Sequence, residues 1–161
     1  MDSPWHVAHT RPRAEKKVAE FFRREGWATE LPLYLSVKRY RGKRLTFHKT
    51  LFPGYVFVRL NPEQIPAARQ HQHIASLLVP PDPEEFSAQL SAILSGLNGQ
   101  LEVRIAPEVI EGRRVRLIGG PLRGVEGVVI ERSKSLEVLL RLDFIGQAAA
   151  FRVAADEVEL I

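Results

Sequence analysis

The sequence has 161 residues, enough for one ordinary domain or two small ones, and a formal net charge of +4. Its hydrophobic content of 45% indicates a folded protein. It contains no Cys, so disulfides, thiol catalysis and thiolate metal sites are excluded. No apolar run is long enough to span a membrane and the N-terminus shows no signal-peptide pattern, so we expect a cytoplasmic protein without membrane contact. The excess of Lys and Arg permits a polyanionic partner, because binding to phosphates releases counterions.

The N-terminal part predicts strands and helices in the order β-α-β-β-α-β. Helical spacing of Ala14, Val18, Phe21 and Phe22 gives the first helix one apolar stripe, opposite a basic side. This order favours a ferredoxin-like α/β sandwich within an α+β fold class. The expected elements are a strand at 5–9, a helix at 12–25, hairpin arms at 27–38 and 45–49, a strand within 51–60, a helix at 62–70, a strand at 74–79 and a helix at 84–97.

The C-terminal part predicts only short strands. We expect five of them, at 113–118, 125–132, 136–143, 147–153 and 158–161, which together indicate a small SH3-like β-barrel. The glycine-rich stretch 119–127 lacks the Gly-Lys-Ser/Thr of a phosphate loop and fits a barrel corner. Residues around Pro107 have no clear period, which places a domain boundary there. The predicted organisation is an N-terminal domain at 1–99, a linker at 100–111 and the barrel at 112–161.

The segment 51–60 is the most informative for function. Alternation along a strand directs Val56 and Val58 to one face, and Tyr55 and Phe57 to the other. If helices cover the valine face, the rings form an exposed docking patch beside the Phe52-Pro53-Gly54 break. The alternative is that a second layer, or the barrel, covers the rings. The residues alone leave both alternatives open.

Two basic clusters are candidates for contact with nucleic acid. One cluster lies at the start of the first helix and the other crowds the hairpin turn, where Tyr40 accompanies it. Lys and Arg from separate segments, with an aromatic ring, are suited to follow a phosphate backbone, whereas a merely solvated basic face is the alternative. The clusters consist of Arg11, Arg13, Lys16 and Lys17, and of Arg39, Arg41, Lys43 and Arg44.

Patterns for catalysis or metal binding are weak. His71 and His73 have no carboxylate at a recognised ligand spacing, and Ser87, Ser91 and Ser95 lie outside any nucleophile-elbow pattern. We therefore expect a protein that is not an enzyme, with no cofactor and no metal.

Three segments resemble the NusG family of transcription elongation factors in the family's order. These are Trp5-His6-Val7 with 10–16, the Leu-Phe-Pro-Gly-Tyr-Val-Phe-Val run at 51–58, and Gly112–Val129, which is similar to a KOW motif. The resemblance implies an N-terminal NGN domain that binds the clamp helices of RNA polymerase, bridges the DNA cleft and suppresses pausing. It places the polymerase contact at Phe52, Pro53, Tyr55 and Phe57. It also implies a KOW barrel that recruits Rho or a small-subunit ribosomal protein, with matching positions at Leu122, Val125 and Ile145.

The Arg-Gly-Lys-Arg turn and the 51–58 run look closer to specialised, RfaH-like paralogues, which act as antiterminators on selected operons. In that subgroup, basic residues at the positions of Arg11 and Lys17 contact the single-stranded non-template DNA. This chain departs from the subgroup at 66–69, where Pro-Ala-Ala-Arg replaces a His-Thr-Thr run. We expect a monomeric antitermination factor. The alternatives are a general NusG that assists Rho-dependent termination, and a KOW-containing RNA-binding or ribosome-associated protein.

Overall fold

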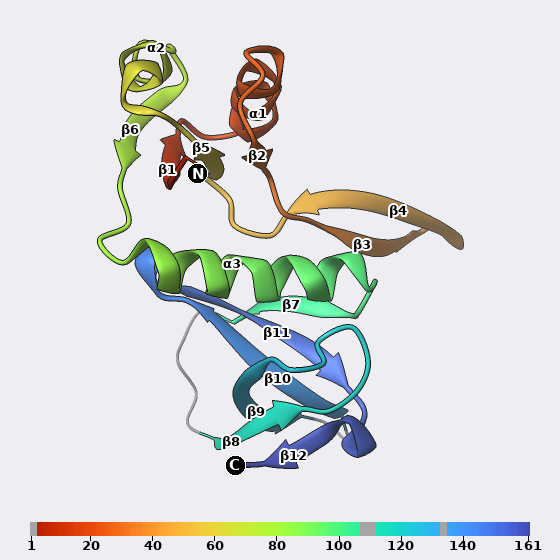
Figure 1. The fold of residues 1–161 in the computed structure, drawn as a ribbon. Helices are drawn as coiled ribbons and strands as arrows, with labels where there is room; N and C mark the ends of the chain where they lie inside the picture. The colour runs from red at the N-terminus through yellow and green to blue at the C-terminus, as the bar shows by residue number, and fades with distance from the viewer. Residues whose placement is uncertain (1–2, 107–111, 133–134) are drawn as a thin grey trace. The chain divides into compact units, whose positions relative to one another are not determined.

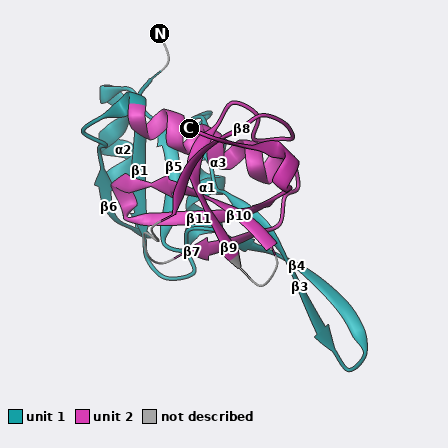
Figure 2. Cartoon of the chain, turned by 90° about the horizontal axis from the view of Figure 1, so that it is seen from below, with its two compact units in different colours: residues 1–84 teal, residues 85–161 magenta. Residues whose placement is uncertain are grey.

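Two compact units make up the structure, a computed structural model that describes residues 3–106, 112–132 and 135–161. Unit 1 comprises Met1–Glu84 and unit 2 comprises Glu85–Ile161 (Figure 2). Across these described ranges, no helix combines the length and apolar character that crossing a membrane requires.

A four-stranded antiparallel sheet forms the centre of unit 1 (Figure 1). Its order is β2-β5-β1-β6, so the central strands β5 and β1 come from distant parts of the sequence. This arrangement agrees with the predicted ferredoxin-like sandwich. The strands are β1 (Trp5–Thr10), β2 (Thr29–Glu30), β5 (Tyr55–Arg59) and β6 (Ile74–Leu78).

Helices α1 (Glu15–Arg24) and α2 (Ile65–Arg69), the latter preceded by the 3-10 turn η1 (Pro62–Gln64), pack on one face of this sheet. The predicted apolar stripe of α1 is confirmed, since Val18 and Phe22 are fully buried against Val56 and Val58 of β5. The helix begins later than predicted because Arg13 has a φ of 64°, a left-handed conformation that no right-handed helix contains.

A long hairpin of β3 (Leu33–Tyr40) and β4 (Lys43–Thr50) forms a separate two-stranded sheet that extends away from the four-stranded sheet (Figure 1). Its turn contains two residues, Arg41 at φ 48° and Gly42 at φ 76°, as type I′ hairpin turns require. The predicted turn was wider, at 39–44. Strand β3 extends to Tyr40 and strand β4 begins at Lys43, because the Arg41-Gly42 pair alone reverses the chain.

Unit 2 contains a six-stranded antiparallel sheet in the order β12-β8-β9-β10-β11-β7. The five predicted strands are all present as β8 to β12, and β7 is additional. The strands are β7 (Val103–Ala106), β8 (Arg113–Leu117), β9 (Glu126–Arg132), β10 (Ser135–Leu142), β11 (Gln147–Val153) and β12 (Val158–Leu160), with 3-10 turns η2 (Asp143–Ile145) and η3 (Ala155–Glu157).

Helix α3 (Pro83–Asn98) packs on the strands of unit 2, which contains all but its first two residues. A Cβ at Gly96 would lie 2.5 Å from the ring of Phe151, so only glycine permits this close approach. Phe86 meets Phe144 edge to face, and the Gln89 side chain exchanges two hydrogen bonds with Asp143.

The prediction placed this helix in a domain at 1–99 and a linker at 100–111. By its contacts the helix belongs with unit 2, and β7 occupies part of the predicted linker by pairing with β11. Arg104 fixes β7 further through a bidentate ion pair with the carboxylate of Glu137, at 2.9 to 3.2 Å. Pro107, which suggested the boundary, lies outside the described residues, so the predicted domain limits stay a prediction.

Candidate functional site

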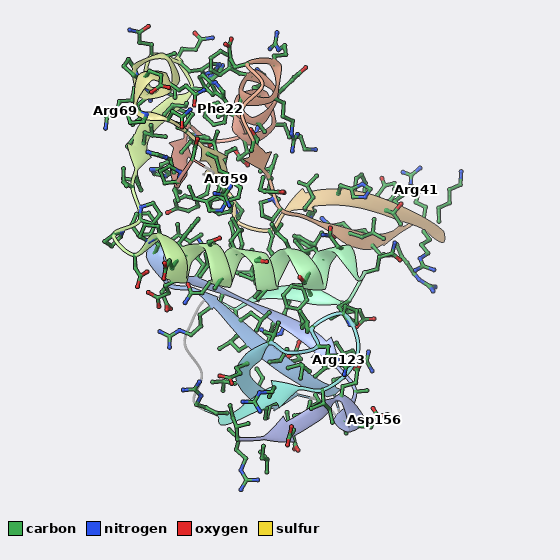
Figure 3. All side chains as sticks on the ribbon, in the orientation of Figure 1. Phe22, Arg41, Arg59, Arg69, Arg123 and Asp156 are labelled. Atoms are coloured by element: carbon green, nitrogen blue, oxygen red, sulfur yellow. The ribbon has the colours of Figure 1, made fainter. Side chains whose placement is uncertain are left out.

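The second face of the unit 1 sheet carries three cross-strand pairs between β1 and β5. At one end, the guanidinium of Arg59 lies 4.4 Å from the ring centroid of Trp5, within the range of a cation–π contact. Figure 3 shows Arg59 within this sheet. In the middle, Val7 and Phe57 are fully buried. At the other end, His9 and Tyr55 stack with ring centroids 5.2 Å apart.

The Phe52-Pro53-Gly54-Tyr55 turn positions Tyr55 beside His9. Tyr55 N–H donates to the carbonyl of Phe52, and Thr10 N–H donates to the carbonyl of Gly54 at 2.8 Å, which ties the turn to the end of β1. Gly54 has a φ of 89°, and the ring of His9 lies 3.6 Å from where its Cβ would be. The turn therefore presents a surface of His9, Pro53, Gly54 and Tyr55, which we call the His9–Tyr55 surface.

The four residues for which the sequence predicted polymerase contact differ in their exposure to solvent. Pro53 is exposed and Tyr55 is half-buried, so both are accessible. Phe52 and Phe57 are only 1% and 0% exposed, and their rings meet edge to face at 6.2 Å. Of the two alternatives that the sequence left open, covered rings apply to these two phenylalanines, which support the turn from inside, and their polymerase contact stays a prediction.

All four predicted basic residues at the start of α1 are exposed. Arg11 is also anchored, because its backbone N–H donates to the carbonyl of His73 and its Nε donates to that of Gln72. Arg13 combines exposure with its left-handed backbone, which costs about 1–2 kcal/mol in a residue with a side chain. The remaining members are Lys16 and Lys17.

The second basic cluster lies at the tip of the hairpin. Arg41, Lys43 and Arg44 are all exposed, and the guanidinium of Arg41 lies 5.5 Å from the ring centroid of Tyr40. Figure 3 shows Arg41 at the far end of the hairpin. In the described part of the chain, no hydrogen bond or ion pair joins this cluster to the one on α1.

The glycine-rich stretch of unit 2 forms the predicted corner between β8 and β9. Gly124 has a φ of 87°, and its N–H donates to the carbonyl of Leu117 at 2.7 Å. Leu122 is buried inside this corner at 1% exposure, and its predicted role on a partner-binding surface stays a prediction. Val125 and Ile145 are half-buried, and Val125 lines a pocket of about 750 Å³ together with α3, β9 and β10.

Two other histidines of unit 1, His6 and His71, pack within the fold. His6 is buried, and burial lowers its pKa despite a contact of Nδ1 with the carbonyl of Pro4 at 3.1 Å. His71 packs on the ring of Phe21 at 4.6 Å, and burial, with His73 as a second cause, lowers its pKa. Within the described ranges, no group of three or more His, Asp or Glu side chains is arranged to hold a metal ion.

Comparison with known proteins decides the family. The sequence pattern of the NusG family, described as transcription termination factor nusG, matches residues 3–89, which is more than half of the chain. The chain belongs to the NusG family. NusG-family proteins are transcription termination and antitermination factors, and the matched range contains the whole sheet of unit 1, the hairpin and the His9–Tyr55 surface.

Two relatives extend the match beyond unit 1. The transcription termination/antitermination protein NusG of Lactococcus lactis is 26% identical over 99% of this chain and 94% of its own length. The solved structure of Thermotoga maritima NusG, described for its domain interaction, is 23% identical, covers 98% of this chain and 97% of its own, and has a TM-score of 0.55. That likeness supports the α+β fold, with an NGN domain followed by a β-rich KOW-type domain.

Sequence reasoning missed His9 as part of the candidate surface. It assigned no role to His9. The missing information was the register of β1 against β5, which places His9 directly beside Tyr55. Strand alternation predicts which face a residue occupies, but only the pairing of strands far apart in sequence reveals its neighbour.

Proposed function

We propose that this NusG-family chain binds RNA polymerase through the His9–Tyr55 surface and acts as an elongation and antitermination factor on selected operons. The observation that supports this most is the accessible His9–Tyr55 stack next to exposed Pro53. Stacked rings beside a proline give a rigid contact area that loses little side-chain entropy on binding, which is typical of interface anchors. The clamp helices of the polymerase are the proposed partner.

Such a factor needs no catalytic chemistry. A protein that binds the closed, elongating polymerase more tightly than the paused enzyme shifts the population toward elongation by its difference in affinity alone. The buried Phe52 and Phe57 contribute by holding the turn that presents Tyr55. The mechanism therefore depends on a pre-formed surface.

Contact with nucleic acid is the second part of the proposal. Arg11, Arg13, Lys16 and Lys17 form an exposed basic surface suited to single-stranded non-template DNA. The anchoring of Arg11 to the carbonyls of residues 72 and 73 restrains its position, which reduces the entropy lost on binding a phosphate. The accessible Val125 and Ile145 of unit 2 are the proposed contacts for a partner protein, either Rho or a small-subunit ribosomal protein.

The polymerase contact is tested by Tyr55→Ala, with Tyr40→Ala as the matched control. Tyr40 is the same residue type, lies on the hairpin and is 61% exposed. We expect Tyr55→Ala to weaken binding to core RNA polymerase by about 1 kcal/mol or more, roughly fivefold, and Tyr40→Ala to leave it unchanged. Titration of labelled protein with core polymerase, in the absence of nucleic acid, measures both. Equal affinity of Tyr55→Ala and wild type, with folding intact, would contradict the proposed surface.

Pause-escape assays on templates with and without Rho separate the alternatives. Faster escape without increased Rho-dependent release supports the antitermination factor. Enhanced release with Rho selects a general NusG. Co-purification with ribosomes, and not with core polymerase, selects a KOW-type RNA-binding or ribosome-associated protein.

A further inference from the structure

The two faces of the β3–β4 hairpin carry different chemistry. Because side chains alternate along a strand, the register assigns four cross-strand pairs to one face: Tyr34 with Lys49, Ser36 with Phe47, Lys38 with Leu45, and Tyr40 with Lys43. All three aromatic residues of the hairpin lie on this face, and so do all three of its lysines. We call it the aromatic–lysine face. The opposite face carries aliphatic side chains, threonines, His48 and the pair of Arg39 with Arg44.

The rings of the aromatic–lysine face are accessible. Tyr40 is 61% exposed and Phe47 is 45% exposed, while Tyr34 at the base of the hairpin is half-buried. A two-stranded sheet that buries neither ring obtains little stability from them. Their position is therefore better explained by a partner than by the fold.

The charge of the hairpin is uncompensated. Every charged residue between 31 and 62 is Lys or Arg. Among the residues that the structure describes, none of the hairpin's cations forms an ion pair. Lys49 lowers the pKa of Lys38, first through a side-chain hydrogen-bond contact and second through the repulsion between the two cations. An anionic partner would relieve this repulsion, whereas a neutral or basic protein surface would leave it in place.

We infer that the aromatic–lysine face binds a single-stranded nucleic acid. Successive pairs along the hairpin are about 6.7 Å apart, so rings and ammonium groups alternate along an extended strip. Unpaired bases can stack on Tyr40 and Phe47 while Lys38 and Lys43 neutralise neighbouring phosphates. In a duplex the faces of the bases are stacked on one another, so a duplex could contact only the charged lysines of this face and not its rings. This inference rests on the proposed nucleic-acid contact and adds to it a defined surface and an unpaired strand.

The test measures binding of the full chain to fluorescent oligonucleotides by anisotropy, over a series of salt concentrations. The probes are one mixed sequence as single-stranded DNA, as single-stranded RNA and as a DNA duplex. We expect either single strand to bind more tightly than the duplex, and the comparison of DNA with RNA identifies the preferred sugar. Tyr40→Ala should weaken single-strand binding about fivefold or more, while Tyr40→Phe, which keeps the ring, should restore it. Lys38→Gln should weaken binding and reduce the slope of log affinity against log salt by roughly 0.7.

The matched control is Leu35→Ala on the opposite face, where Leu35 is 57% exposed. It should leave affinity unchanged, and fluorescence of Trp5 and Trp27 confirms folding of unit 1 for every variant. Tighter binding of the duplex, no loss with Tyr40→Ala, or an equal loss with Leu35→Ala would overturn the inference. So would capture of a protein partner that needs Tyr40 when no oligonucleotide binds. Because the oligonucleotide assay contains no polymerase, its outcome is separate from that of Tyr55→Ala.

Discussion

The four-stranded sheet of unit 1 and its β3–β4 hairpin are both antiparallel and adjacent in sequence, yet they use their side chains in opposite ways. The sheet buries Val56 and Val58 completely under α1 and α2. The hairpin leaves Leu35, Tyr40 and Phe47 largely exposed. In the sheet, the rings and aliphatic groups hold the fold together. In the hairpin, similar residue types are presented outward, which indicates that composition alone does not separate core from contact surface.

The largest expected effect tests this difference directly. Phe22→Ala removes a fully buried ring from the core beneath α1 and should lower the free energy of unfolding by about 3–5 kcal/mol. Phe47→Ala removes the same ring from the exposed hairpin and should lower it by less than about 1 kcal/mol. Both tryptophans lie in unit 1, so denaturant unfolding followed by tryptophan fluorescence reports on this unit. Similar losses for the two variants would contradict the comparison.

The second expected effect is a dependence of the free energy of unfolding on pH, which arises from histidines that pack within unit 1. Burial lowers the pKa of His6 from its usual value of 6.5, so the folded state binds fewer protons than the unfolded state just below that pH. The free energy of unfolding should therefore rise with pH up to about pH 6.5 and then level off. His71 contributes with the same sign. His6→Gln should flatten the rise in a series of unfolding curves, and an unchanged slope would remove His6 as its cause.

The smallest expected effect concerns two arginines that hold left-handed backbone conformations. Arg13 precedes α1 at φ 64°, and Arg41 lies in the hairpin turn at φ 48°. Glycine adopts these angles without steric cost, so Arg13→Gly should stabilise unit 1 by about 0.5–1 kcal/mol. Arg41→Gly should protect only the amides of β3 and β4 from hydrogen exchange, because the hairpin is a separate sheet. Stabilisation accompanied by weaker nucleic-acid binding would show that these arginines serve binding at the expense of the fold.

Local signals in the sequence predicted most of the fold. The apolar stripe of α1 and the alternation in 51–60 placed the right residues toward the core of unit 1. The turn chemistry of 119–127 predicted the corner in unit 2. These signals act over a few residues, so they are readable without long-range information.

The remaining features depend on contacts between distant segments. The burial of Phe57, the pairing of His9 with Tyr55 and the packing of Gly96 on Phe151 each require two elements far apart in the chain. β7 was missed because a four-residue strand has too short a pattern to distinguish it from a linker. Its pairing with β11 and the Arg104–Glu137 ion pair supply what the local pattern lacks.

The two-stranded hairpin also has a consequence for the protein's behaviour in concentrated solution. Both β3 and β4 leave one row of backbone groups unpaired, and such edges readily pair with those of another copy. The like charges of Lys38, Lys43 and Lys49 oppose that association by repulsion. Salt shortens the range of this repulsion, so self-association through the hairpin should become easier as ionic strength rises. The same lysines that we assign to a nucleic-acid strand would thus keep the unbound protein colloidally stable.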